Sequence, residues 1–238
     1  MSQNIFDNPT FFSGYMELRA GLNYNDLLEL PEMKKLLPSL LGKRILDLGC
    51  GFGKMEEFFV KNGASEVTAV DISEKMIGEA IKKHSFSNVR YIRMDISNLN
   101  LDEEYDIVYS SLVFHYIKDF EKLMRQINSL LKKDGVLLFS QEHPLTTATV
   151  DYRGHFDDYN HFVFGDYQRE GKRKGTWFVE NVENYHRTIS HIINTVSSFF
   201  RIEKVVEPVP SEDALRLMPR MERDFIRPTF LIVKASKQ

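Results

Sequence analysis

The chain has 238 residues, of which 42% are hydrophobic and 27% charged, which is ordinary for a globular protein with a sizeable core. Its formal net charge of −3 argues against a broad attraction to nucleic acid or to an anionic membrane. A single cysteine excludes an intramolecular disulfide, and neither a secretory signal nor an apolar run of membrane length is visible. We therefore predict a soluble cytoplasmic protein, monomeric or homodimeric, with one domain and additional segments or at most two small domains.

The N-terminal residues 1–43 precede the first predicted core strand. Residues 11–20 (FFSGYMELRA) and residues 25–40 (NDLLELPEMKKLLPSL) both suit short helices. We predict that this segment is a helical cap, which either only packs on the rest of the chain or contributes to a binding site.

From residue 44 onward, short apolar runs alternate with amphipathic segments, and this alternation predicts a parallel sheet with helices on both faces. Ser73 is placed to cap the second of these helices. A helix over residues 187–200 precedes a final strand pair, whose last member we expect to be inserted antiparallel. The seven predicted strands cover residues 44–48, 66–71, 88–95, 105–111, 135–141, 201–208 and 228–236. We predict one α/β domain over residues 44–238.

Two segments interrupt or follow this pattern. Residues 144–185 are rich in Tyr, Phe, Asp, Gly and His without clear periodicity, and they are too long for a plain loop. We therefore predict a functional insertion or lid over residues 143–186, in which the basic run REGKRKG (169–175) is a solvated loop. Residues 211–227 (SEDALRLMPRMERDFIR) indicate a surface helix.

The stretch ILDLGCGFGKMEE (45–57) places three alternating glycines between a predicted strand and helix. A P-loop is excluded because Met55, rather than Ser or Thr, follows Lys54. A dinucleotide-binding turn fits poorly, since Lys54 stands where its third glycine belongs and Asp47 would oppose a pyrophosphate. An acidic, glycine-lined turn instead favours a cationic ligand without phosphate, such as S-adenosylmethionine.

Acids also end the next two predicted strands. Asp71 closes the second strand about twenty residues after the glycines, where α/β nucleoside-binding domains place a carboxylate on the ribose hydroxyls. Asp95 closes the third strand. Either acid alone could be a helix cap or a turn residue, but three acids at successive strand ends favour a nucleoside site.

The motif DLGCGFG resembles the first motif of the class I S-adenosylmethionine-dependent methyltransferases. The segments FFSGYMELR, YSSLVFHYIKDF, FSQEHP and YHRTISHIINT are similar to those of small-molecule enzymes of the type 11 group, so the resemblance covers nearly the whole chain. It implies a Rossmann-like seven-stranded sheet, mostly parallel with an antiparallel last strand, and S-adenosylmethionine as the cofactor. The reaction implied is methyl transfer to a small-molecule acceptor, with S-adenosylhomocysteine as the product.

The resemblance also implies which residues hold the methionine portion of the cofactor. Asp47 is the acid of the motif, and Ser110 after the fourth strand would border the methionyl end. Tyr15 and Arg19 could reach the donor or its carboxylate if the N-terminal helix folds over the site, the alternative being an ordinary surface helix. The loop residues implied to line this portion are Gly49, Cys50 and Gly51.

For the nucleoside portion, the resemblance implies two strand-end pairs. Asp71 and Ile72 would hold the ribose and flank the adenine. Asp95 and Ile96 would meet the adenine itself.

Methyl transfer to an oxygen or nitrogen atom, which we expect rather than transfer to carbon, needs a base, and near neutral pH the base is usually histidine. His115 follows the fourth strand, His143 follows the fifth, and His186 ends the insertion. Each could equally be structural, as we expect for His84 and His191. The pattern predicts no metal site.

The aromatic residues of the insertion could form a pocket for an aromatic or otherwise apolar acceptor, or they could only pack the insertion onto the sheet. We favour Tyr167 and Trp177 as pocket residues. The full aromatic set is Tyr152, Phe156, Tyr159, Phe162, Phe164, Tyr167, Trp177 and Phe178.

Two other functions remain open from the sequence. A nucleic-acid methyltransferase, for example one acting on tRNA, is disfavoured because the segment after the fourth strand lacks the Asn/Asp-Pro-Pro-aromatic pattern of base-amine enzymes. A non-catalytic S-adenosylmethionine-binding module is the second alternative, since the pattern identifies no base with certainty.

Overall fold

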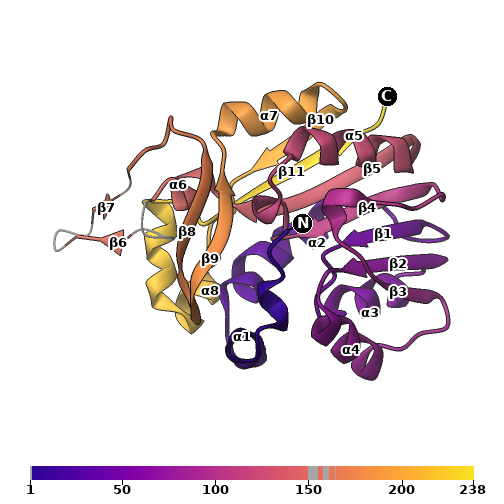
Figure 1. The fold of residues 1–238 in the computed structure, drawn as a ribbon, viewed down its shortest axis with the longest axis horizontal. Coiled ribbons are helices and arrows are strands. Elements are labelled where there is room, and N and C mark those ends of the chain that lie inside the picture. The colour runs from indigo at the N-terminus through magenta and orange to yellow at the C-terminus, as the bar shows by residue number, and fades with distance from the viewer. Residues whose placement is uncertain (1, 150–154, 158–160, 164) are drawn as a thin grey trace.

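The computed structural model describes residues 2–149, 155–157, 161–163 and 165–238. Within these residues one seven-stranded sheet has the order β10-β11-β5-β4-β1-β2-β3 (Figure 1). Neighbouring strands are parallel except at β11, which runs antiparallel to both β5 and β10. The strands are β1 (Arg44–Leu48), β2 (Glu66–Asp71), β3 (Val89–Arg93), β4 (Tyr105–Ser111), β5 (Leu131–Glu142), β10 (Arg201–Val206) and β11 (Phe230–Ser236). This confirms the predicted Rossmann-like sheet.

Helices cover both faces of the sheet. On one face, α2 (Leu30–Leu36) and α3 (Lys54–Lys61) contribute to one buried apolar cluster. On the other face, α5 (Phe120–Leu130) and α7 (Ile189–Ser197) contribute to a second. In Figure 1, α5 and α7 lie above the sheet, while α3 and α4 (Glu74–Lys83) lie below it.

Helix α5 illustrates how the sequence sets these layers. Asp119 caps its first turn by accepting a hydrogen bond from the backbone N–H of Lys122. Its buried side chains recur every three or four residues and form one apolar stripe against the sheet. They are Phe120, Leu123, Met124, Ile127 and Leu130.

The N-terminal segment forms the predicted helices. Helix α1 (Pro9–Ala20) begins after Asn8, whose side chain accepts from the backbone N–H groups of the first turn. A π-helical turn η2 (Asn25–Glu29) leads directly into α2. Whether residues 1–43 act as a unit separate from residues 44–238 stays a prediction.

The insertion after β5 contains more regular structure than its sequence indicates. It includes the short helix α6 (Pro144–Thr147) and the strand pair β6 (His155–Phe156) and β7 (Phe162–Val163). A longer antiparallel hairpin follows, formed by β8 (Gly171–Trp177) and β9 (Val179–His186). The basic run predicted as a loop therefore lies largely within β8.

The β8–β9 hairpin escaped prediction because its turn carries no glycine, proline or asparagine signal. The chain reverses at Phe178, whose φ is +57°, a conformation that aromatic residues rarely adopt. On the strands, Lys172 and Lys174 place Nζ 2.6 and 3.4 Å from the Glu183 carboxylate. Cross-strand ion pairing with Glu183 therefore accounts for the two lysines of β8.

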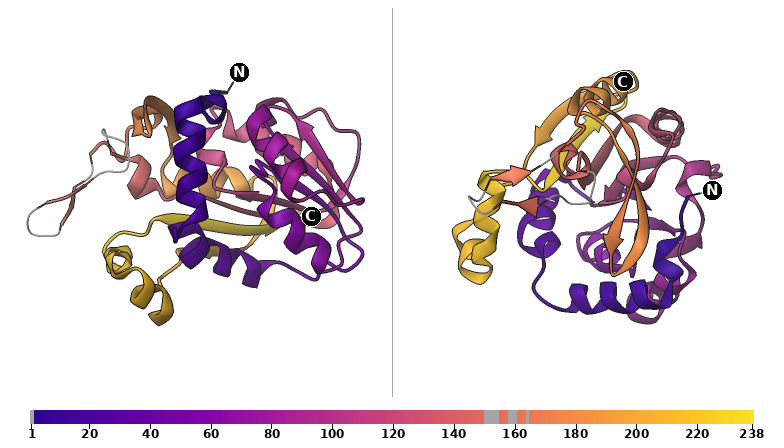
Figure 2. Two further views of the ribbon diagram at one scale, coloured as in Figure 1. Left: turned by 90° about the horizontal axis from the view of Figure 1, so that it is seen from below. Right: turned by 60° about the vertical axis from the view of Figure 1, so that its left-hand side comes forward.

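The tip of this hairpin lies against α1 (Figure 2). The Trp177 ring meets those of Phe11 and Tyr15 at centroid distances of 5.2 and 5.9 Å, both edge to face. Such aromatic pairs favour a fixed relative placement of the two elements. The insertion and the N-terminal segment thus form one covering layer at the carboxyl edge of the sheet.

The segment between β10 and β11 is helical, as predicted, but in two pieces. Helix α8 (Glu212–Leu217) ends before the 3₁₀ helix η5 (Pro219–Phe225), which begins at a proline. Among the described residues, no helix combines the length and the apolarity needed to cross a bilayer.

Candidate active site

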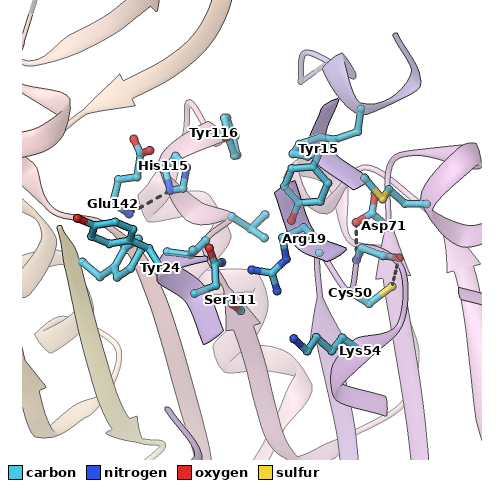
Figure 3. Close-up of a pocket in the computed structure, with 18 of the residues that line it drawn as sticks. Tyr15, Arg19, Tyr24, Cys50, Lys54, Asp71, Ser111, His115, Tyr116 and Glu142 are labelled. Atoms are coloured by element: carbon cyan, nitrogen blue, oxygen red, sulfur yellow. Dashed lines mark hydrogen bonds between the residues drawn. The ribbon is translucent and has the colours of Figure 1, made fainter. Parts of the chain in front are cut away.

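A cavity of about 500 Å³ opens at the carboxyl edge of the sheet. Parallel strands direct their carboxyl ends to one edge, where ligands of such folds gather. Figure 3 shows Cys50 and Asp71 on one side of this cavity, His115 and Glu142 on the other, and Arg19 between them. We call the first side the glycine-loop end and the second the His115 end.

The glycine loop after β1 is shaped by close packing at one position and by open space at another. Gly49 has a φ of +83°, and a Cβ there would lie 2.2 Å from Cγ2 of Val113. Gly51 has a φ of +57°, but a Cβ there would meet no atom within 4 Å. Gly49 lets the loop lie against the chain after β4, whereas Gly51 exposes backbone to the cavity.

The first amides of this loop are engaged within the protein. The N–H groups of Gly49 and Cys50 both donate to the Val70 carbonyl, at 2.7 and 3.0 Å. The N–H of Gly51 donates to Oδ2 of Asp71 at 2.9 Å. Phosphate-binding loops present such amides to the ligand, so this geometry agrees with a ligand that brings no phosphate here.

Asp71 ends β2 on the cavity wall. Its Oδ1 accepts from the Ser73 N–H at 2.8 Å, and its Oδ2 accepts from Gly51. Burial raises the pKa of this carboxyl to about 6, against the opposing effect of these two hydrogen bonds. Each oxygen retains a lone pair for a ligand hydroxyl.

Asp95 lies on the same wall, but a second segment reaches it. Oδ2 accepts from the backbone N–H of Ser2 at 2.9 Å, and Oδ1 accepts from the Ser97 N–H at 3.0 Å. Burial acts to raise the pKa of Asp95, but these hydrogen bonds lower it below its usual value. Ile72 and Ile96, the predicted adenine neighbours, also line the cavity.

Asp47 and Glu56 form a buried carboxyl pair behind the glycine loop. Asp47, 2% exposed, lines the cavity, and Glu56 of α3 is fully buried. Among the described residues, neither oxygen of Glu56 nor Oδ1 of Asp47 has a hydrogen-bond partner, so little around this pair stabilises a negative charge. Burial and then mutual repulsion raise the pKa of Asp47 well above its usual value, and burial raises that of Glu56 to about 7.

Tyr15 and Arg19 of α1 both lie on the cavity wall, so this helix covers the site. The Arg19 side chain is 8% exposed, and its NH1 donates to Asn23 at 2.9 Å. Asp26 accepts from Lys54 at 2.6 Å and lies 3.6 Å from Arg19. The buried Nε of Arg19 has no hydrogen-bond partner among the residues that the structure describes, so it can donate to a ligand.

The placement of Ser110 corrects its prediction by one residue. Its hydroxyl is buried and donates to the Leu48 carbonyl at 2.7 Å, away from the cavity. Successive side chains of a strand point to opposite faces, and it is Ser111 that lines the cavity. The Ser111 hydroxyl donates to the buried Glu29 carboxylate at 2.8 Å.

Of the three candidate histidines, the structure brings only His115 to the described cavity wall. The ring is 3% exposed and lies 4.2 Å, centroid to centroid, from that of Tyr116. Its Nδ1 accepts a hydrogen bond from the backbone N–H of Glu142 at 3.3 Å. If the ring is neutral, this hydrogen bond assigns its proton to Nε2.

His143 and His186 are not among the residues that line the cavity, so the structure does not bring these two predicted bases to the site. His143 accepts from the Leu145 N–H and places Nε2 2.8 Å from Glu207. His186 lies with Nδ1 2.8 Å from the Thr147 hydroxyl and Nε2 2.8 Å from the Tyr167 carbonyl. Both side chains are buried away from the cavity, and burial lowers the pKa of each ring.

Of the two aromatic residues favoured for an acceptor pocket, Trp177 lines the cavity. Tyr167 does not line it, because its hydroxyl accepts from the Ile189 N–H at 3.0 Å at the start of α7. Phe178 packs on Phe11 instead, at 5.5 Å between centroids. The side chains of Phe156 and Phe162 are not described, and the residues outside the described ranges are Tyr152, Tyr159 and Phe164.

Sequence reasoning missed most of the His115 end. Its polar and aromatic residues come from segments distant in sequence, although Ser111, Tyr116 and Glu142 lie within the recognised segments YSSLVFHYIKDF and FSQEHP. The missed residues are Tyr24, Ser111, Tyr116, Glu142, Thr146, Arg220, Arg223, Asp224 and Arg227. Glu142 directly precedes His143 at the end of β5, so strand alternation was the available signal.

The glycine-loop end of the cavity thus carries the strand-end acids expected of a nucleoside site, and the His115 end carries the carboxyl group of Glu142. Among the described residues, no group of three or more His, Cys, Asp or Glu side chains is arranged to hold a metal ion. Cys50 lines the cavity with a buried thiol whose pKa is raised well above its usual value by burial, so it is not an activated nucleophile.

Comparison with known proteins identifies the family. A model of the methyltransferase domain matches residues 46–139. An uncharacterised protein of Haemophilus influenzae is 35% identical over 98% of this chain and 97% of its own length. A malonyl-[acyl-carrier protein] O-methyltransferase of Bacillus cereus is 39% identical, but over only 41% of this chain and 36% of that enzyme.

A solved structure extends the likeness to the fold. The S-adenosylmethionine-dependent methyltransferase of Mesorhizobium loti is 34% identical, with a TM-score of 0.83 over 88% of this chain and 97% of that one. Sequence identity and structural similarity to known proteins therefore both extend over most of this chain. This chain belongs to the S-adenosylmethionine-dependent methyltransferases.

Proposed function

We propose that this enzyme methylates an oxygen or nitrogen nucleophile of a small-molecule acceptor and releases S-adenosylhomocysteine. The observation that carries the proposal is one cavity that joins the glycine-loop end to the His115 end. Its volume of about 500 Å³ lies within the range of small-molecule and cofactor sites. The names of partial relatives, a malonyl-[acyl-carrier protein] and a ubiquinone biosynthesis O-methyltransferase, support an oxygen nucleophile.

The nucleoside portion of the cofactor would lie along β2 and β3. Asp71 has lone pairs for the ribose hydroxyls, and ligand hydroxyls would favour its ionised form. Ile72 and Ile96 offer apolar surface to an adenine ring, and Asp95 can accept from its amino group through the less occupied Oδ2.

The methionine portion would lie between the glycine loop and α1. Asp47 lines the cavity where the ammonium group would come, and a cation there would favour the ionised form of the buried Asp47–Glu56 pair. Arg19 offers its buried Nε–H to the carboxylate of the same portion. The cationic and anionic ends of the amino acid would thus each meet an opposite charge.

S-adenosylmethionine supplies an activated methyl group on a sulfonium, so the protein must align the acceptor and remove its proton. We propose that the Nε2–H of His115 donates to the acceptor atom and orients its lone pair. The carboxylate of Glu142, on the same wall, then receives the proton of a neutral hydroxyl or amine. The electron pair of the broken carbon–sulfur bond stays on sulfur.

The first test is binding followed by turnover. Calorimetric titration with S-adenosylhomocysteine should show a single site, and S-adenosylhomocysteine release should then be measured across panels of small phenols, carboxylic acids and amines. With a hydroxyl or amine acceptor, Glu142→Gln should lower kcat by about 10²–10⁴-fold, the scale of a lost general base. His115→Gln, which keeps a donor, should lose less.

Two outcomes would contradict the proposal. Absence of S-adenosylhomocysteine binding by a folded protein would remove the cofactor site. Binding without turnover on any panel, together with turnover on tRNA or DNA, would favour nucleic acid as the acceptor. The matched control is His191→Gln on the exposed face of α7, where the ring pairs with Glu170, and it should leave the rate unchanged.

A further inference from the structure

We infer that the acceptor carries an oxyanion, a carboxylate or a phosphate, and that Arg220, Arg223 and Arg227 bind it at the mouth of the His115 end. This inference rests on the proposed function, because it names the chemical class of that acceptor. All three guanidinium groups belong to residues that line the cavity.

The three arginines share one side of one segment. Arg220 and Arg223 are one turn apart on η5, and Arg227 follows at the next helical interval. Exposed Phe225 and Ile226 of the same segment do not line the cavity. The segment therefore places three basic residues on the cavity wall, and Arg220 and Arg223 also border a neighbouring hollow with Phe225 and Ile226.

Aromatic and hydroxyl groups hold two of these arginines in place. The Arg220 guanidinium lies 5.7 Å from the centroid of the Tyr24 ring, a cation–π contact. Arg227, half-buried, donates from NH1 to the hydroxyl of Thr146 after β5. These contacts orient the planar forks before a ligand arrives, which reduces the entropy lost on binding.

Charge is distributed unequally between the two ends. At the glycine-loop end the lining carboxylates outnumber the lining cations, and both cations, Arg19 and Lys54, already share Asp26. The three carboxylates there are Asp47, Asp71 and Asp95. This excess of acid suits a cofactor with a sulfonium and an ammonium group.

At the His115 end the balance is reversed. Three guanidinium groups line it against the two carboxyl groups of Glu142 and Asp224. Asp224 is engaged by the Thr229 hydroxyl and by Tyr24, and burial raises the pKa of its carboxyl. Among the described residues that line this end, guanidinium groups therefore outnumber carboxyl groups by one, although the whole chain carries a formal net charge of −3.

Guanidinium groups bind carboxylate and phosphate oxygens through paired N–H donors, and a cluster at a cavity mouth attracts anions from solution. A neutral aromatic acceptor would offer these donors no anionic group. The aromatic side chains Tyr24, Tyr116 and Trp177 remain available for the apolar body of the acceptor. The inferred acceptor is thus a small organic anion.

The test compares matched anionic and neutral probes on the S-adenosylhomocysteine-loaded enzyme. Calorimetry should measure 3-(4-hydroxyphenyl)propionate against its primary amide, and phenyl phosphate against phenol. We expect the preferred anion to bind about tenfold or more tightly than its neutral partner, since each lost charged hydrogen bond has that scale. The stronger of the two anions distinguishes a carboxylate from a phosphate acceptor.

Two variants assign the preference to the arginines. Arg227→Gln should lower the affinity for the preferred anion about tenfold and leave the neutral probe unchanged. Arg216→Gln is the matched control, because Arg216 is exposed on α8, pairs with Asp213 and does not line the cavity.

Equal binding of anion and amide, no binding of either anion, or an equal effect of the two variants would overturn the inference. Each of these results, obtained while S-adenosylhomocysteine still binds, leaves the proposed methyl transfer intact. Failure of the wild-type protein to bind S-adenosylhomocysteine contradicts the proposed function instead.

Discussion

The two ends of the cavity differ in how the chain builds them. The glycine-loop end lies at the carboxyl ends of β1, β2 and β3, three adjacent parallel strands. The His115 end is assembled from the ends of β4 and β5, the β8–β9 hairpin, the N-terminal segment and η5. Most of the glycine-loop end is therefore encoded locally at strand ends, whereas the His115 end depends on segments that only the complete fold brings together.

This difference predicts that a substitution at one end of the cavity can impair that end without impairing ligand binding at the other. The largest effect should follow from Gly49→Ala, which puts a Cβ against Val113 at a positive φ. Left-handed strain and overpacking together should lower the free energy of unfolding by about 2–5 kcal/mol. Urea denaturation followed by circular dichroism measures it. Gly51→Ala, where a Cβ meets open space, should cost about 1–2 kcal/mol; equal losses would contradict the packing argument.

Asp71→Ala should weaken the glycine-loop end alone. We expect S-adenosylhomocysteine to lose about 1–3 kcal/mol of binding free energy, the scale of lost charged hydrogen bonds, while anionic probes at the His115 end keep their affinity. Calorimetry of both ligands provides the comparison. Asp102→Ala, at an exposed position outside the cavity, is the control. Unchanged S-adenosylhomocysteine affinity would show that Asp71 is not the ribose ligand.

A lower pH should weaken ligand binding at the glycine-loop end without any substitution. Burial raises the pKa of Asp71 in the fold to about 6, above that of an exposed aspartate. The ligand-free fold therefore loses stability as the pH rises from about 4 to about 6, where the unfolded chain ionises first. Ribose hydroxyls that donate to the ionised form offset this cost, so S-adenosylhomocysteine affinity should fall as the pH falls through 6. The loss should approach tenfold at about pH 5. Asp71→Asn should flatten this part of the profile, and the same slope in that variant would refute the assignment.

A further effect should follow from Trp177→Ala at the hairpin tip. Loss of the edge-to-face contacts with Phe11 and Tyr15 should lower the free energy of unfolding by about 0.5–1.5 kcal/mol per contact. Affinity for aromatic anion probes should fall more than affinity for S-adenosylhomocysteine. Trp177→Phe, which keeps a ring, is the control. A greater loss for S-adenosylhomocysteine would show that the hairpin serves the glycine-loop end.

The sequence predicted the sheet because each buried strand and each amphipathic helix carries its own pattern. The acids Asp47, Asp71 and Asp95 were found for the same reason, since a strand end can be located without tertiary contacts. Ser110 was misplaced because a shift of one residue reverses the direction of a strand side chain.

The remainder of the site depends on contacts that no local pattern contains. The hydrogen bonds from Ser2 to Asp95 join residues 93 positions apart. His143 and His186 stand near the carboxyl edge, as their positions suggested, but their rings turn toward Glu207 and Thr147. Whether a histidine near an edge faces the cavity is decided by its packing partners, so sequence position alone could not separate these two from His115.

The place of β11 has a consequence for how the protein is made. This strand follows every other strand of the sheet in sequence, yet it lies between β5 and β10. During synthesis, β10 therefore has no neighbour to join until residues 230–236 have been added. The half of the sheet that carries the glycine loop can form early on the ribosome, while the half nearer the acceptor waits with an unpaired strand edge. Slow completion of this edge exposes the nascent chain to mispairing at β5, and chaperone dependence should concentrate there.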